Sequence, residues 1–331
     1  MYQINRFLVV FFLSAFAVNA QNDVRKEFFG MWAIEIEDGS VGWLNINDDN
    51  GYMDAKLLWQ AGSPFEVASI YFVDDYTLVV TRPTNVRRDE NRTHVFTRTF
   101  TIKRTGNNLT GTAVIPPYFE GRNVTTSTFV GWRLPDPSPA PDLSQIKYGT
   151  PVNLFNGTDL NGWRLINPNT LNPFKVVNGE LVSEPDRTEG QTVGFGNIRT
   201  ESEFEDFKLT FEVNIPEGSN SGVFLRGMYE VQIIDSYGSE LDSHNMGALY
   251  GYIAPSVSAE KKTGEWQTME IILCKRHVTS ILNGIKIIDN QPVYGPTGDA
   301  LHADPFKSGP IILQGNMRKV SFRNIVLTPI L

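Results

Sequence analysis

The chain has 331 residues, with 29 Lys or Arg against 37 Asp or Glu, so its net charge is −8 at pH 7. This length allows two domains, and a hydrophobic content of 41% excludes wholesale disorder. The acidic balance argues against a nucleic-acid partner, which needs a basic face. A single cysteine excludes an internal disulfide framework and a zinc site built from several thiolates.

Residues 1–20 predict a signal peptide. Arg6 supplies a positive amino-terminal region, Phe7–Phe16 supplies a short apolar core, and small residues precede a cleavage point after Ala20. The apolar run is shorter than the roughly 20 residues of a membrane-spanning helix, and no cysteine near the cleavage point offers a lipid anchor. We therefore expect an exported protein, periplasmic or secreted, without a membrane anchor.

Residues 21–134 predict a small β-barrel. Segments rich in β-branched and aromatic residues alternate with turn signals such as Asp38-Gly39 and Asn50-Gly51. Eight strands with short connections favour an up-and-down barrel, and Gly30-Met31-Trp32 resembles the opening of lipocalin-like barrels. Side chains usually fill a barrel of this size. The predicted strands are Trp32–Glu37, Gly42–Ile46, Tyr52–Trp59, Val67–Val73, Tyr76–Arg82, His94–Arg104, Leu109–Ile115 and Thr125–Arg133.

Residues 135–150 predict an extended linker. Prolines stand at Pro135, Pro137, Pro139 and Pro141, and each removes a backbone donor and restricts φ. The linker separates the predicted barrel from the carboxyl-terminal part of the chain.

Residues 151–331 predict an all-β sandwich. The segment Lys208–Val213 alternates apolar and polar residues, which is typical of a strand with one buried face. Asn283-Gly284 is a strong hairpin signal, because both turn positions need a positive φ. Further strands are expected at Trp266–Cys274 and Val320–Leu327, and no segment shows helical spacing beyond two turns.

An ordered series of motifs runs through the same region. They are Leu154-Phe155-Asn156-Gly157, Leu160-Asn161-Gly162-Trp163, Phe174–Leu181, Ser221–Gly227, Tyr229–Asp235, Gly247–Tyr252, Gly264-Glu265-Trp266, Ile312-Leu313-Gln314 and Phe322-Arg323-Asn324-Ile325. In order and spacing the series resembles the 3-keto-disaccharide hydrolase family. The resemblance implies a concanavalin-like jelly roll, an oligosaccharide or glycoside substrate, and a functional link to a sugar 3-dehydrogenase that would make the ketone.

Strand alternation places four side chains of these motifs together. If a three-residue loop, Gly227-Met228-Tyr229, joins two strands, Phe224, Arg226, Glu230 and Gln232 share the face that points away from the core. Such a face suits a sugar, whose hydroxyls need donors and acceptors and whose C–H faces stack on aromatic rings. The alternative is a surface ion pair between the arginine and the glutamate, which would contribute little.

The chemistry that the resemblance implies needs a base and an acid. A ketone at carbon 3 acidifies the proton on carbon 2, and an acid then helps the aglycone leave carbon 1. We expect Glu230 or Asp235 to serve as acid or base, with Arg226 and Gln232 as electrostatic and hydrogen-bonding partners. His244 lies in a polar loop before the Gly-Ala-Leu-Tyr-Gly motif and is a further catalytic candidate.

Aromatic and amide residues of the family motifs are expected to contact the substrate. These are Tyr250, Trp266, Gln314 and Asn316. Family members often read Leu-Gln-Asp-His-Gly near the last strands, whereas here Leu313-Gln314 precedes Gly315-Asn316-Met317. This departure keeps open a second function, a non-catalytic carbohydrate-binding protein that uses the same face. The sequence requires no cofactor and leaves a need for a divalent cation open.

Overall fold

The computed structural model describes residues 24–117, 122–185, 192–315 and 317–331. The predicted signal peptide therefore lies outside the described residues. Two compact units make up the chain, one formed by Met1–Leu58 and Phe65–Pro135, the other by Trp59–Pro64 and Asp136–Leu331. No helix within the described ranges is long and apolar enough to cross a membrane.

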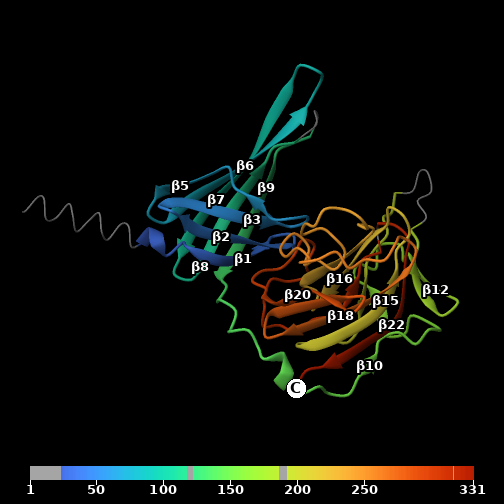
Figure 1. The fold of residues 1–331 in the computed structure, drawn as a ribbon. Helices are drawn as coiled ribbons and strands as arrows, with labels where there is room; N and C mark the ends of the chain where they lie inside the picture. Colours follow the sequence, from blue (N-terminus) through green and yellow to red (C-terminus); the bar gives the residue numbers. More distant parts are fainter. Residues whose placement is uncertain (1–23, 118–121, 186–191, 316) are drawn as a thin grey trace, which may run out of the picture. The chain divides into compact units, whose positions relative to one another are not determined.

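The first unit is one antiparallel sheet of nine strands in the order β4-β3-β2-β1-β9-β8-β7-β6-β5 (Figure 1). The strands are β1 (Gly30–Ile36), β2 (Val41–Asp49), β3 (Tyr52–Trp59), β4 (Phe65–Glu66), β5 (Ser69–Asp74), β6 (Thr77–Arg87), β7 (Thr93–Thr105), β8 (Asn108–Ile115) and β9 (Thr125–Arg133). Hairpins join most of them, so the predicted β character and meander order are confirmed.

This sheet is a curled half-barrel, and the more specific likeness to a small lipocalin-like barrel stays a prediction. The expected strand Val67–Val73 is broken, because Val67 donates to the carbonyl of Ala55 at 3.0 Å while Ala68 donates to that of Thr81 at 2.9 Å. The break leaves two short edge strands, β4 and β5, at opposite ends of the sheet, and no ladder between them occurs in the described part of the unit. The buried face is filled by side chains, among them the fully buried Trp32 and Phe100.

The second unit is a sandwich of two antiparallel sheets. The larger has the order β12-β13-β22-β15-β18-β19-β20 with β10 paired to β22, and the smaller has the order β11-β14-β21-β16-β17. The larger contains β10 (Val152–Asn153), β12 (Phe174–Val177), β13 (Glu180–Ser183), β15 (Phe207–Asn214), β18 (Trp266–Cys274), β19 (His277–Leu282), β20 (Ile285–Pro292) and β22 (Val320–Pro329). The smaller contains β11 (Trp163–Leu165), β14 (Ile198–Thr200), β16 (Asn220–Leu225), β17 (Tyr229–Ile234) and β21 (Ile312–Leu313).

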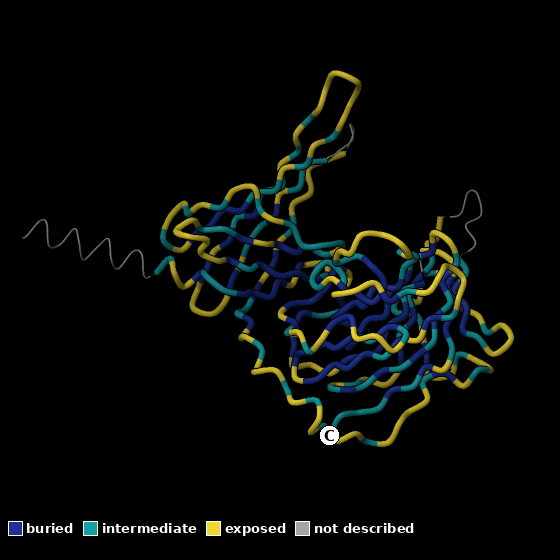
Figure 2. Tube along the Cα trace, viewed as in Figure 1, coloured by how far each residue is buried: buried dark blue, intermediate teal, exposed yellow. Residues whose placement is uncertain are grey.

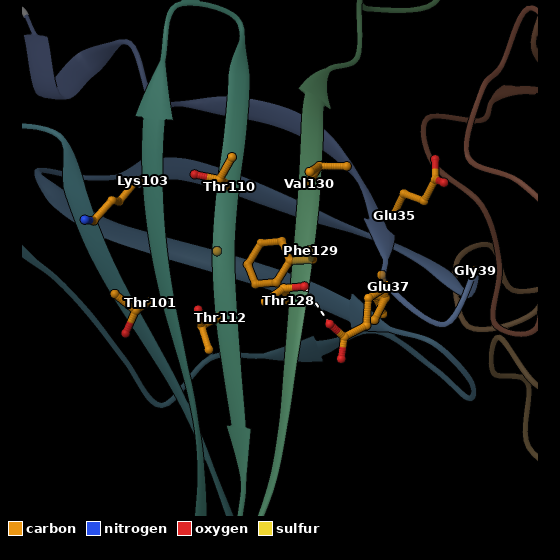
Figure 3. A pocket seen from close by; sticks show the side chains of 12 residues that line it. Glu35, Glu37, Gly39, Thr101, Lys103, Thr110, Thr112, Thr128, Phe129 and Val130 are labelled. Carbon is orange, nitrogen blue, oxygen red and sulfur yellow. Dashed lines mark hydrogen bonds between the residues drawn. The ribbon is translucent and has the colours of Figure 1, made fainter.

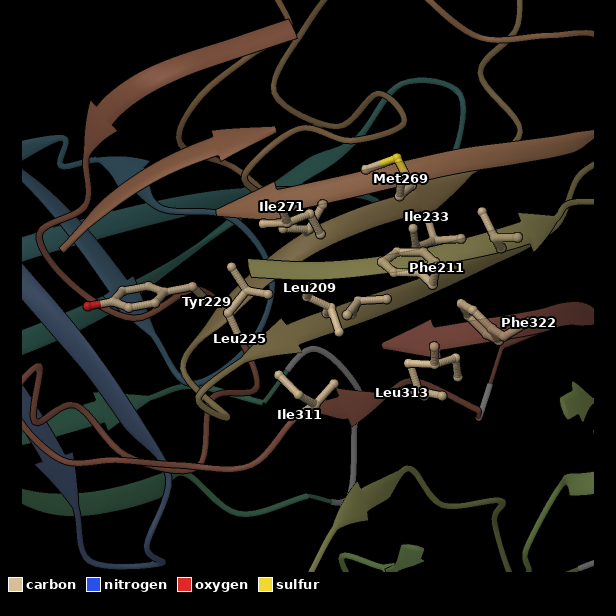
Figure 4. Packing of buried hydrophobic residues seen from close by; sticks show 14 of the residues in the cluster. Leu209, Phe211, Leu225, Tyr229, Ile233, Met269, Ile271, Ile311, Leu313 and Phe322 are labelled. Carbon is tan, nitrogen blue, oxygen red and sulfur yellow. The ribbon is translucent and has the colours of Figure 1, made fainter. Parts of the chain in front are cut away.

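The core of this sandwich lies between the two sheets (Figure 4). Leu209 and Phe211 of β15 enter it from the larger sheet, and Leu225 and Ile233 of β16 and β17 enter it from the smaller one. Alternation along each strand decides which side chains are buried there, so the opposite face of β16 and β17 is left for other side chains. The predicted jelly-roll sandwich is confirmed.

The proline-rich segment lies along the second unit. Asn290 Nδ2 donates to the carbonyl of Pro141 at 2.9 Å, and Tyr148 forms an isolated bridge with Ile330. Between them Asp142 caps a single 3₁₀ turn, η1 (Leu143–Gln145).

Candidate functional site

The candidate site is the face of β16 and β17 that points away from the core. Phe224 pairs with Glu230 and Gly222 pairs with Gln232 across these strands, whereas Val223 and Val231 belong to the core cluster. The loop has three residues, 226–228, and begins one residue earlier than predicted; because its length is still odd, Phe224, Glu230 and Gln232 share one face.

Glu230 is held on this face by its own backbone. Its N–H donates to Thr297 Oγ1 at 2.8 Å, and its carbonyl accepts from the N–H of Tyr250 at 2.9 Å. The side chain crosses Gly222, where a β-carbon would lie 2.9 Å from Cγ and Cδ and closer still to Oε1. A glycine at that position therefore makes the room that the carboxyl occupies.

The environment of Glu230 keeps its carboxyl protonated at neutral pH. The residue is 5% exposed, and burial first, then the charge of Asp299, raises its pKa to about 8. Within the described part of the chain no group hydrogen-bonds to its carboxyl oxygens. A buried, protonated and unpaired carboxyl can donate a proton to a bound molecule.

Gln232 presents a second unpaired group on the same face. It is 2% exposed, and its Oε1 has no hydrogen-bond partner among the described residues. Leaving a buried acceptor unpaired costs about 1–3 kcal/mol. A ligand that brings a hydroxyl to this oxygen would remove that cost, so Glu230 and Gln232 together indicate a site for a polar, hydroxyl-bearing molecule.

Sequence reasoning missed the loop that follows β20. Thr297 fixes Glu230 through the hydrogen bond above, and Thr297 itself is anchored by a hydrogen bond of 3.0 Å from its N–H to the carbonyl of Met228. Asp299 has a φ of 62°, and partial burial raises the pKa of its carboxyl although the residue as a whole is exposed. No strand alternation marks these residues; their only signal is a polar turn, Pro296–Asp299, between apolar segments.

His302 lies in the same loop. Its Nε2 contacts the carbonyl of Arg226 at 3.1 Å, and its buried Nδ1 has no partner in the part of the chain that the structure describes. Burial lowers the pKa of this histidine, and the backbone contact opposes that effect. The imidazole of His302 is therefore neutral at neutral pH.

Arg226 does not share the face of Glu230, and the prediction that it does is wrong. The loop consists of residues 226–228, so Arg226 has left the strand with a φ of 56° and alternation no longer applies. Its Nε donates to the carbonyl of Lys307 at 3.0 Å and its Nη2 to that of Pro305 at 2.9 Å. Its charge acts on Tyr229, a core residue. The guanidinium thus anchors the loop after β20 to the sheet.

The two other predicted catalytic residues lie at different places. Asp235, just beyond β17, accepts from the N–H of Gly218 at 2.9 Å and from Thr263 Oγ1 at 2.7 Å, so its carboxyl braces turns. His244 Nε2 lies 2.6 Å from Ser63 Oγ, and its ring stacks edge-on against Tyr250 at 5.1 Å. The N–H of Tyr250 donates to the Glu230 carbonyl, so His244 is connected to Glu230 through Tyr250. In this sense His244 lies nearer to the site than Asp235 does.

The predicted substrate-contacting residues also divide. Gln314 lies beside the site, since its N–H donates to the carbonyl of Gly222 at 2.9 Å. Trp266 lies on β18 of the other sheet, where Arg323 covers its ring at 3.9 Å. The structure therefore does not bring Trp266 together with Glu230. Asn316 lies outside the described residues.

Two hollows lie outside this face. One, of about 620 Å³, is on the polar face of the first unit and is lined by threonines together with Glu35, Glu37 and Lys103 (Figure 3). The other, of about 360 Å³, is on the outer face of the larger sheet, next to Glu212 and Glu270. No group of three or more His, Cys, Asp or Glu side chains with metal-binding geometry occurs in the ranges that the structure describes.

Comparisons with known proteins concern the second unit. The family model of the 3-keto-alpha-glucoside-1,2-lyase-like domain matches residues 150–328, and no curated protein matches the chain. A structure titled as a candidate glycosyl hydrolase from Parabacteroides distasonis is 27% identical, covering 57% of this chain and 92% of its own, with a TM-score of 0.44. A second from that organism is 25% identical, covering 55% and 100%, with a TM-score of 0.42. An endo-beta-1,3(4)-glucanase of glycoside hydrolase family 16 is 13% identical, covering 59% and 95%, with a TM-score of 0.35.

Proposed function

The chain belongs to the family of 3-keto-alpha-glucoside-1,2-lyase-like domains, and on this premise we propose that it cleaves 3-keto-glycosides, including 3-keto-disaccharides, by elimination or hydrolysis. The observation that carries the proposal is the buried, unpaired carboxyl of Glu230 on the face that points away from the core. The family name supports a carbohydrate substrate and a bond change between carbons 1 and 2.

The reaction needs two proton transfers. A base takes the proton from carbon 2, which the neighbouring ketone acidifies, and the electron pair forms the double bond between carbons 1 and 2. The bond between carbon 1 and the glycosidic oxygen breaks, and an acid protonates that oxygen as the aglycone leaves. Addition of water to the resulting enone completes net hydrolysis.

We assign the acid role to Glu230. With a pKa of about 8 it carries its proton at neutral pH, and a carboxylic acid kept neutral by burial is the form that can donate to a leaving group. Among the charged groups of the described residues, Asp299 is the one whose charge raises the pKa of Glu230. Where the surroundings of two neighbouring carboxyls give them different pKa values, the carboxyl with the higher pKa serves as the acid and the other as the base. Asp299 is therefore our candidate for the base. Gln232 would bind a hydroxyl of the sugar.

The test is turnover of a purified 3-keto-disaccharide. We expect wild-type protein to release the aglycone, and Glu230→Gln to lose at least 100-fold in rate because the amide cannot donate a proton to the leaving oxygen. Glu240→Gln is the matched control, since Glu240 is an exposed acid in the loop that follows β17. Incorporation of solvent deuterium at carbon 2 would identify elimination.

A carbohydrate-binding protein without catalysis is the second candidate. The observation in its favour is the replacement of the Asp-His-Gly tripeptide that family members often carry by Gly315-Asn316-Met317. Binding of the keto-disaccharide without aglycone release, unchanged in Glu230→Gln, would support this candidate and contradict the enzyme.

We further propose that the protein is exported. The amino-terminal residues Phe7–Phe16 and the small residues before Gln21 support this. Mass spectrometry of protein recovered from outside the cytoplasm should find Gln21 or a close neighbour at the amino terminus, and an intact Met1 would contradict the proposal.

A further inference from the structure

The longest hairpin of the first unit extends past the rest of its sheet. Strands β6 and β7 pair from Thr77↔Lys103 to Arg87↔Thr93. Their outer neighbours stop earlier, because β5 pairs only up to Thr81 and β8 only up to Thr99. Residues 82–98, here called the arm, therefore form a two-stranded ribbon that projects from the sheet (Figure 1) and is exposed or half-buried along its length (Figure 2).

The arm is basic in an acidic protein. Its 17 residues include five arginines and two acids, Asp89 and Glu90, whereas the whole chain has a net charge of −8. The arginines are Arg82, Arg87, Arg88, Arg92 and Arg98. A ribbon of two strands is marginally stable by itself, so this concentration of like charge on it needs a physical reason.

Three of these arginines stand at the exposed tip without an acidic partner. Arg87, Arg88 and Arg92 form no ion pair in the described part of the chain. Arg87 Nε donates to the carbonyl of Asp89 at 3.2 Å. Arg88 lies 5.2 Å from the Phe96 ring centroid and its Nε donates to His94 Nδ1 at 3.3 Å. These contacts orient guanidinium groups without neutralising them.

We propose that the arm is a docking site for a polysaccharide that carries carboxylate groups. A guanidinium binds a carboxylate through two parallel hydrogen bonds. Arg87, Arg88 and Arg92 lie within six consecutive residues at the end of the ribbon, so their charges are concentrated at one place, on both faces of the tip. Such a cluster suits the repeated charges of an acidic glycan chain.

Two competing roles for the arginines lead to different expectations. Arginines on open strand edges can simply prevent edge-to-edge aggregation, in which case no ligand binds. Nucleic acid is disfavoured because its binding needs a broader basic face than one hairpin of an acidic protein. The choice of a glycan rests on the proposed function of the second unit.

The experiment measures binding of the full chain to polygalacturonate, with neutral dextran as the comparison polymer. We expect binding to polygalacturonate at low salt, weakening as salt increases, and none to dextran. The variant Arg87→Ser/Arg88→Ser/Arg92→Ser should bind at least tenfold more weakly. The matched control removes the same charge from exposed lysines elsewhere, Lys147→Ser/Lys262→Ser/Lys286→Ser, and should stay within twofold of wild type.

Several outcomes would overturn the proposal. These are no binding to polygalacturonate at low salt, equal weakening in the arm and control variants, or tighter binding to double-stranded DNA than to polygalacturonate. Thermal unfolding of both variants checks that the arm change leaves the fold intact; if the triple variant unfolds, Arg92→Ser alone should still weaken binding severalfold. Glu230→Gln should bind polygalacturonate as wild type does, so that failure of the catalytic proposal is distinguishable from failure of this one.

Discussion

The carboxyl of Glu230 lies over the α-carbon of Gly222 on the neighbouring strand, in the space that any larger residue would fill with its β-carbon. The acid and the glycine are diagonal neighbours, since Gly222 pairs with Gln232 and Glu230 pairs with Phe224. The position of the proposed proton donor thus depends on the absence of a side chain at Gly222.

Replacing Gly222 tests this dependence. We expect Gly222→Ala to reduce kcat for the 3-keto-disaccharide by at least tenfold, because the methyl group displaces the Glu230 carboxyl. Gly194→Ala is the control, since a β-carbon at Gly194 meets nothing within 4 Å. Wild-type kcat in Gly222→Ala would show that the carboxyl is free to move and that its placement does not matter.

The raised pKa of Glu230 makes stability depend on pH. An ordinary glutamate has a pKa near 4.5, whereas the pKa of the buried Glu230 is about 8, so between these values the unfolded state releases a proton that the folded state retains. The free energy of unfolding therefore falls as pH rises through this window, by roughly 3–5 kcal/mol, and levels off above it. Glu230→Gln should remove this fall.

Urea unfolding at pH 5 and pH 9 measures this effect. Glu230→Gln is expected to lose less stability than wild type between the two pH values, whereas Glu240→Gln should follow wild type. The same dependence in all three proteins would mean that Glu230 titrates as an ordinary glutamate.

Asp299 should influence the titration of Glu230. Its negative charge contributes to the raised pKa, so Asp299→Asn should lower the pKa of Glu230, while Asn tolerates the positive φ of this position. Carbon-13 NMR titration of the glutamate carboxyls measures the shift. Asp304→Asn in the same loop is the control, because the charge of Asp304 acts on His302. An unchanged titration in Asp299→Asn would remove Asp299 from the site.

Arg226 should stabilise the fold and leave substrate contact unaffected. Arg226→Ala leaves the carbonyls of Pro305 and Lys307 without their donor, and we expect a loss of about 2–4 kcal/mol in unfolding free energy. Arg323→Ala, which breaks a more exposed pair with Glu212, should cost about 1 kcal/mol or less. A large rise in KM with unchanged stability in Arg226→Ala would restore the predicted role of Arg226 as a sugar contact.

Sequence patterns predicted the strands of this protein well where alternation was regular. Trp266–Cys274 has the predicted bounds, and Phe224, Glu230 and Gln232 share one face because the loop has an odd number of residues. The patterns failed at Arg226, where the residue at which the loop begins decides the direction of a side chain. A three-residue loop that begins at Arg226 instead of Gly227 shifts every cross-strand pair by two residues and leaves Phe224 and Glu230 on the same face. It nevertheless decides whether the guanidinium points into the site or to the carbonyls of another loop.

The rest of the candidate site could not be predicted from strand alternation, because its residues lie in loops. Thr297 and Asp299 are far from Glu230 in sequence, and only the fold brings their loop to β17. Likewise the break in the expected strand Val67–Val73 depends on two residues, Val67 and Ala68, whose hydrogen bonds to different strands have no signature in composition.

The backbone N–H and carbonyl of Glu230 both form hydrogen bonds with loops, the N–H with Thr297 and the carbonyl with Tyr250. Glu230 itself lies on a strand whose opposite face packs into the core, whereas the loop after β20 carries both Thr297 and Asp299. In the proposed enzyme, a change in this loop would therefore alter the position of the proton donor together with the surroundings of the substrate.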